Sequence, residues 1–245
     1  MGTSAAYDAP PSWGNLKSEV TRAADEGSIA PATAQQILRH YVHENGGVRQ
    51  IARGATSGGG GGRVGSGAAA RQVAGRVGGF VSDVAAFGLP EALKRAGLSE
   101  LIGRPVADIL NGLLDKLGGP GSTMDDVDAR AALSSLQEKL LADAADAEAV
   151  EQVFTDANAN IDQVLQDFFG FYLYEQFCRV FYERLVQRVG EMQAQSFLGQ
   201  IREFILSSLA NRTIGLNIAQ IDWPGSEGAE MVSDIMEATL AVFGS

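Results

Sequence analysis

Apolar residues recur at helical spacing along most of this chain, and the densest stretch lies between residues 160 and 189. Its apolar positions, three or four residues apart as in an amphipathic helix, are Ile161, Val164, Leu165, Phe168, Tyr174, Phe177, Cys178, Phe181, Leu185 and Val189. Eight of the 18 aromatic residues fall between Phe168 and Tyr182. A helix that is apolar on most sides is usually interior, so the pattern predicts a central helix surrounded by others.

The same period continues on both sides of this segment and is interrupted by glycine and proline, which predicts further helices joined by short turns. The capping-box spacing of Thr123 and Asp126 marks one helix start. We expect helical segments over residues 15–26, 31–44, 48–53, 68–87, 89–97, 98–102, 106–117, 123–141, 146–154, 192–209 and 227–243, and an extended segment over 213–223. The predicted fold class is all-α, a multi-helix bundle around the central aromatic-rich helix.

Two stretches depart from the helical pattern. The first is small, polar and broken by Pro10-Pro11, which predicts a flexible N-terminal arm that Trp13 could tie to the body. The second is rich in glycine, so backbone entropy opposes any fixed structure there. The expected organisation is a flexible arm over 1–14, a short helical segment over 15–53, a Gly-rich linker over 54–67 and a helical core domain over 68–245, which a break near 118–122 could subdivide.

The net charge of −11 is unevenly distributed along the chain. Residues 1–104 carry 11 Lys/Arg and 8 Asp/Glu, whereas residues 105–245 carry 8 and 22. Such an acidic body argues against general affinity for nucleic acid or anionic membranes. The single cysteine, Cys178, suits a reducing compartment and is expected to be a small buried hydrophobe. Without a membrane-spanning run or a secretory signal, the sequence predicts a cytoplasmic protein with no membrane partner.

One basic zone stands out in this acidic chain. Residues 45–82 contain no acidic residue and five arginines, namely Arg49, Arg53, Arg63, Arg71 and Arg76. Such a zone could grip nucleic acid, but aromatic residues for base stacking are lacking between Tyr41 and Phe80. Docking on an acidic partner, or on the acidic half of this same chain, is at least as well supported.

The sequence offers no coherent catalytic or metal-binding set. The glycine-rich stretch is not a phosphate-binding loop, because none of the four lysines follows a glycine. His40 and His43 are three residues apart, but a metal would need a third ligand from elsewhere. The acidic cluster of Asp125, Asp126 and Asp128 lies at a helix start, where carboxylates are favoured anyway. We therefore expect no enzyme activity, no cofactor and no metal site.

Several short segments, in their order along the chain, resemble one known family. They are Met1-Gly-Thr-Ser-Ala-Ala, the proline and tryptophan arm that follows, Leu38-Arg-His-Tyr-Val-His-Glu-Asn-Gly-Gly47, and Leu101-Ile-Gly-Arg-Pro-Val-Ala-Asp-Ile-Leu110. Together they resemble the QatB component of the bacterial Qat anti-phage defence system. The resemblance covers residues 1–140 best and is thinner beyond them.

The resemblance implies a non-catalytic component that acts with an ATPase, a cyano-deazaguanine-synthase-like enzyme and a TatD-like nuclease. Met1 precedes the small residue Gly2 and is ordinarily removed from such a position. We hypothesise that Gly2 then accepts an N-terminal modification from the synthase-like partner, with Thr3 and Ser4 as recognition residues. The alternative is a binding module that contacts nucleic acid or an acidic partner through the zone from Arg49 to Arg76.

Overall fold

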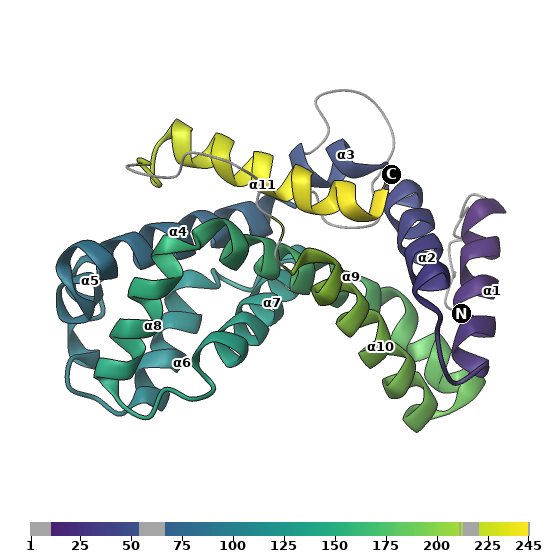
Figure 1. Cartoon of the computed structure of the whole chain (residues 1–245), viewed down its shortest axis with the longest axis horizontal. Helices are drawn as coiled ribbons and strands as arrows, with labels where there is room; N and C mark the ends of the chain where they lie inside the picture. Colours follow the sequence, from purple (N-terminus) through teal and green to yellow (C-terminus); the bar gives the residue numbers. More distant parts are fainter. Residues whose placement is uncertain (1–10, 54–66, 211, 213–220, 245) are drawn as a thin grey trace, which may run out of the picture.

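The computed structural model describes residues 11–53, 67–210, 212 and 221–244. Over these residues the chain forms α-helices and one short 3₁₀ helix, without a β-strand, which confirms the all-α prediction. The helices are α1 (Pro11–Asp25), α2 (Pro31–Glu44), α3 (Val48–Arg53), α4 (Ala68–Phe87), α5 (Leu89–Arg95), the 3₁₀ helix η1 (Ser99–Leu101), α6 (Val106–Leu117), α7 (Met124–Leu141), α8 (Ala147–Ala159), α9 (Ile161–Val189), α10 (Glu191–Leu209) and α11 (Ser226–Gly244). Figure 1 shows α4, α5, α6 and α8 gathered at one end and α1, α2 and α10 at the other.

Helix α9 is the central helix that the aromatic pattern predicts. It packs against α1, α4, α7, α8, α10 and α11. Every residue from Val164 to Leu173 is buried, including two polar ones. Gln166 Nε2 donates to the backbone oxygen of Arg212 at 2.9 Å, and the carboxylate of Asp167 accepts from Lys139 Nζ at 2.6 Å. This part of the helix is therefore enclosed on all sides, and its polar side chains have partners, as buried polar groups require.

Aromatic side chains fix the N-terminal helices to α9. The ring centroids of Tyr41 on α2 and Phe177 on α9 are 5.3 Å apart in an edge arrangement, and those of Phe177 and Phe181 are 4.6 Å apart. Trp13 on α1 contacts both Tyr41 and Phe181, with centroids 6.4 Å away in each case. Trp13 is buried, so it ties the start of the described chain to the core as expected.

The first helix begins earlier than the sequence suggested. We expected residues 1–14 to form a non-helical arm, but α1 starts at Pro11 and takes in Trp13 and Gly14. Proline is well suited to a first helical turn, because its missing N–H has no intrahelical acceptor there and its φ is already close to helical. Pro11 therefore belongs to α1 rather than to a break that continues to Gly14.

Other regions of interest lie outside the described residues. They are residues 1–10 of the predicted arm, 54–66 of the predicted linker and 213–220 of the segment expected to be extended. The buried apolar side chains from Trp13 to Phe243 belong to one cluster. The division of the chain into domains stays a prediction. None of the helices in the described ranges is long and apolar enough to cross a lipid bilayer.

Acidic side chains cap helices in four places of the described chain, one of which is the N-cap residue Asp146 of α8. The predicted capping box opens α7, where Thr123 and Asp126 bond to each other's backbone N–H. Two other helices, α4 and α5, follow glycines that offer no capping side chain. The N–H of Ala69 donates instead to Asp125 Oδ2 at 3.2 Å, and that of Leu89 to Glu151 Oε2 at 2.7 Å. These carboxylates interact favourably with the partial positive charge of helix N-termini. The bond from Ala69 also links α4 to α7, and the bond from Leu89 links α5 to α8.

Candidate functional site

The predicted site residues fall into three groups in the structure. Those outside the described part of the chain are Gly2, Thr3, Ser4 and Arg63. The others are Arg49 and Arg53 on α3, and Arg71 and Arg76 on α4. The two helices give their arginines different surroundings.

The arginines of α3 face the acidic side of α11. Arg53 donates from Nη2 to Asp234 Oδ1 at 2.5 Å and from Nε to Glu237 Oε2 at 2.7 Å. Arg49 Nε lies 3.4 Å from Glu237 Oε1. The hydrogen bond from Arg53 is the main reason why the pKa of Glu237 lies below its usual range. Helix α3 thus docks on an acidic face of the same chain.

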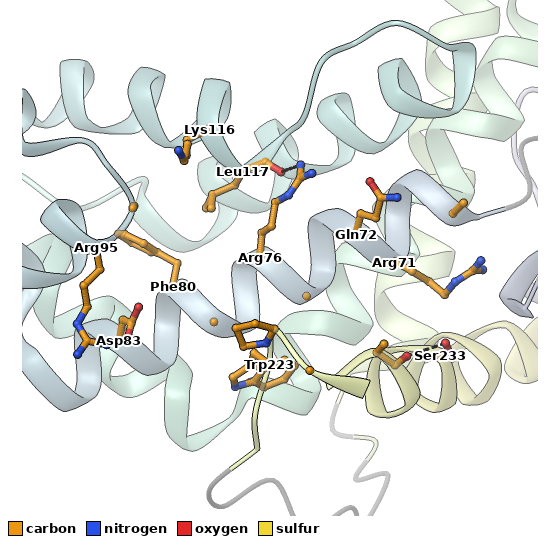
Figure 2. Close-up of a pocket in the computed structure, with 17 residues that line it drawn as sticks. Arg71, Gln72, Arg76, Phe80, Asp83, Arg95, Lys116, Leu117, Trp223 and Ser233 are labelled. Atoms are coloured by element: carbon orange, nitrogen blue, oxygen red, sulfur yellow. Dashed lines mark hydrogen bonds and ion pairs between the residues drawn. The ribbon is translucent and has the colours of Figure 1, made fainter. Parts of the chain in front are cut away.

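The arginines of α4 line a groove of about 640 Å³. Figure 2 shows it between α4, the end of α6 and the segment that leads into α11. Arg95 and Lys116 from the ends of α5 and α6 also line the groove, as does Trp223. Pockets of roughly 300–1,000 Å³ are the size that commonly holds ligands, so we call this feature the α4 groove and take it as the candidate site.

Small residues of α4 form part of the groove. Gly78 lies under the ring of Trp223 so closely that an added Cβ would come within 2.7 Å of the ring atom Cδ2. The indole Nε1 of Trp223 donates to Ser82 Oγ on the same helix at 2.8 Å. At Gly75, by contrast, an added Cβ would meet nothing within 4 Å. The missing side chains let the segment around Trp223 approach α4, and they leave open space one turn earlier.

Two of the four cations that line the groove, Arg95 and Arg71, connect the two ends of α4 to neighbouring segments. Arg95 Nη1 lies 3.1 Å from Asp83 Oδ1, and its guanidinium carbon lies 3.9 Å from the centroid of the Phe87 ring. Arg71 Nη1 donates to the backbone oxygen of Ala52 at 2.5 Å, and burial lowers the pKa of Arg71. These two side chains brace the ends of α4 against its neighbours.

The other two cations have no carboxylate partner among the described residues. Arg76 Nη1 donates to the backbone oxygen of Leu117 at 3.2 Å, which holds the guanidinium at the end of α6. Lys116 makes no ion pair or hydrogen bond with the described part of the chain. Asp83 is the one carboxylate among the described residues that line the groove, and it is paired with Arg95. The α4 groove therefore carries net positive charge in an acidic protein.

The acidic cluster at the start of α7 serves the fold. Asp126 belongs to the capping box, and Asp125 Oδ1 accepts the hydroxyl of Tyr172 from α9. Asp128 Oδ2 lies 2.9 Å from both Nε and Nη2 of Arg179. Burial raises the pKa of Asp128, while the bond from Arg179 acts in the opposite direction. Each carboxylate thus has a structural partner of its own.

The histidines and the cysteine were the remaining chemical candidates. His40 Nδ1 lies 3.0 Å from Glu19 Oε2 on α1, and His43 points to its neighbour Glu44 at 3.5 Å. Among the described residues no group of three or more potential metal ligands comes together. Burial raises the pKa of the Cys178 thiol to about 12, so it stays protonated at neutral pH and is a poor nucleophile.

Sequence reasoning missed half of the groove's positive charge. Arg95 and Lys116 lie outside the basic zone that the arginine count defined, and Trp223 is more than a hundred residues away from both. They meet because α5, α6 and the segment before α11 all pack around α4. No spacing in the sequence signals this meeting.

Comparison with known protein families gives a match. The sequence model of a family described as "Qat anti-phage system associated protein QatB" matches residues 58–243. The matched range takes in α4 to α10 and nearly all of α11, and with them every residue of the α4 groove. It extends far beyond residues 1–140, the part in which the short segments resemble the family best, and leaves Met1 to Ala6 outside. No curated protein and no solved structure matches the chain.

Proposed function

Because this chain belongs to the QatB family of Qat anti-phage system components, we propose that it acts there as a non-catalytic protein partner. Its partners in the proposal are an ATPase, a cyano-deazaguanine-synthase-like enzyme and a TatD-like nuclease, which are the ones that the resemblance implies. We further propose that it works in the cytoplasm, since its one cysteine suits a reducing compartment.

The observation that carries the proposal is the family match over residues 58–243. The use of the chain's polar side chains supports a non-catalytic role. The acidic cluster is the nearest approach in the sequence to an acid–base set, yet its carboxylates cap helices or pair with Arg179. These carboxylates therefore have structural roles in the fold, and we assign them no catalytic one.

Within this role, we propose that Gly2 accepts a modification from the synthase-like partner. Removal of Met1 would expose the amine of Gly2, which is a nucleophile at the very end of the chain. Thr3 and Ser4 would then be the residues that the enzyme recognises. The support for this step is the identity of these N-terminal residues together with the kind of partner that the family resemblance implies.

Intact-mass spectrometry tests the proposed modification. The protein is purified after expression alone and after co-expression with the synthase-like enzyme of the same system. We expect a discrete mass increase only in the second sample, located on Gly2 by peptide fragmentation. The matched control is Gly2→Ala, which also permits removal of Met1 and keeps a primary amine.

Two results would contradict the Gly2 proposal. One is an unchanged mass after co-expression with an active partner. The other is a modification that survives in the variant Gly2→Pro, because proline offers only a hindered secondary amine. A modification on an internal residue would give this second pattern and would leave Gly2 without a role.

A further inference from the structure

We propose that the α4 groove binds a short acidic segment of a partner protein in an extended conformation. The inference rests on the proposed function in one respect, since it supplies a surface and a recognition chemistry for a chain that works through partners. Its basis is the groove itself: the charge of its walls, the shape of its floor and the way its aromatic rings are covered.

The positive charge of the groove favours an anionic ligand. Arg76 and Lys116 are exposed and have no carboxylate partner among the described residues, so a ligand carboxylate would not displace an existing ion pair. Arg76 is already held in place by the backbone oxygen of Leu117, which reduces the entropy lost when it binds a ligand. Complementary charge of this kind favours encounter with an acidic surface and fixes its orientation.

The length and floor of the groove suit a peptide backbone. The lining residues of α4 run from Ala68 to Asp83, a span of about 22 Å at 1.5 Å per helical residue. An extended chain covers that span with roughly six or seven residues. The open space over Gly75 lets a backbone approach α4 closely, as glycine allows at such contacts.

The aromatic rings of the groove do not favour nucleic acid. Phe80 and Trp223 are only 5% and 7% exposed, and the indole N–H of Trp223 is bonded to Ser82. Neither ring is therefore free to stack on a base, as single-stranded nucleic acid binding requires. A long polyanion would also be repelled by the acidic remainder of the chain. A short acidic peptide avoids that repulsion because it contacts the groove alone.

Fluorescence anisotropy of the full chain with a fluorescein-labelled hexaglutamate peptide tests the inference. We expect saturable binding in low salt that weakens as salt is added, and no binding of hexaglutamine. Reversing one groove charge, by Arg76→Glu or Lys116→Glu, should weaken binding by about fivefold or more, since each removes one ion pair. The control is Arg188→Glu at the end of α9, which makes the same change in net charge away from the groove and should bind like wild type.

A second variant blocks the floor without changing any charge. Gly75→Leu places a side chain in the open space of the groove and should abolish most of the peptide binding. Gly199→Leu on α10 is its matched control, because an added Cβ there also meets nothing within 4 Å. Circular dichroism of both variants is measured first, and their binding is compared only if both keep the helical content of wild type.

Three outcomes would overturn the inference. The first is peptide binding by Gly75→Leu that equals wild type, and the second is equal loss of binding in Arg188→Glu and Arg76→Glu. The third is tighter binding of a hexathymidylate than of hexaglutamate with the same dependence on Arg76, which would assign the groove to nucleic acid. The proposed function is tested separately by co-expression, so a failure here leaves it standing.

Discussion

Two glycines on one face of α4 show how the same residue type serves opposite purposes. Gly78 is covered by the indole of Trp223, whereas Gly75 borders open space. Both have helical neighbours, so both bear the cost of roughly 0.5–1 kcal/mol that glycine carries in a helix relative to alanine. At Gly78 the cost is offset by close packing, and at Gly75 it keeps the floor of the groove open.

Replacing each glycine by alanine should therefore change stability in opposite directions. We expect Gly75→Ala to raise the free energy of unfolding by about 0.5–1 kcal/mol, because it gains helix propensity without a clash. Gly78→Ala should lower it by about 1–3 kcal/mol, since its Cβ collides with the Trp223 ring. Urea denaturation followed by circular dichroism measures both. Equal effects from the two substitutions would mean that Trp223 does not rest on Gly78.

A partly buried carboxylate on α9 makes stability depend on pH. Burial is the main cause that raises the pKa of Glu175; the charge of Asp128 adds to it, and that of Arg202 opposes it. A raised pKa in the folded state means that the folded protein disfavours the carboxylate relative to the unfolded chain. The resulting cost is absent at low pH and grows as pH rises above about 4.3, the ordinary value for glutamate.

Glu175→Gln removes this ionisation while keeping the shape of the side chain. We expect the variant to be more stable than wild type at pH 7 and the difference to shrink as pH falls towards 4, because wild-type Glu175 then takes up a proton. Urea denaturation of both proteins between pH 4 and pH 7.5 gives the comparison. A difference that stays constant over this range would show that the charge of Glu175 is not its cause.

At the scale of elements, one buried hydroxyl joins three helices. Tyr172 on α9 donates to Asp125 at the start of α7, and Asp125 in turn accepts the N–H of Ala69 in the first turn of α4. Gln176 Nε2 donates to the Tyr172 hydroxyl at 2.6 Å. The site is buried, which raises the pKa of Tyr172 well above its usual value and keeps it a donor.

Removal of the Tyr172 hydroxyl should destabilise the fold considerably, although it deletes only one oxygen atom. Tyr172→Phe leaves the carboxylate of Asp125 and the amide of Gln176 each without one partner, so we expect a loss of about 1–3 kcal/mol in the free energy of unfolding. Tyr182→Phe is the matched control, because Tyr182 lies 40% exposed on the same helix and should change stability by less than about 0.5 kcal/mol. Similar changes in the free energy of unfolding for the two variants would show that the hydrogen bond between Tyr172 and Asp125 does not stabilise the fold.

The elements themselves were largely predictable from the sequence, because helical periodicity and capping are local. The central helix α9 and the capping box of α7 lie where the pattern puts them. The place of Pro11 to Gly14 within α1 was missed, since proline can either break a helix or stand in its first turn. The groove was predictable only in part: the pattern singled out Arg71 and Arg76, but their distant neighbours are brought to them by tertiary packing.

At the scale of the whole molecule, charged side chains have two different uses. Some form ion pairs within the chain, whereas those of the α4 groove are proposed to bind a partner. The C-terminal part is strongly acidic, and its helix α11 binds the arginines of α3 through Asp234 and Glu237. The α4 groove stays positive beside it. The groove lies wholly within the range that matches the QatB family, and the proposed acceptor Gly2 lies outside that range.

The central claim is that this chain works by binding the other components of its system, and complex formation tests it most directly. The chain is co-expressed with each of its three proposed partners, the synthase-like enzyme, the ATPase and the nuclease, and each pair is analysed by size-exclusion chromatography with light scattering. We predict that the pair with the synthase-like enzyme elutes as one species whose mass is the sum of both chains in a fixed ratio. Separate elution of this chain from all three proteins, each folded and at its own mass, would contradict the claim.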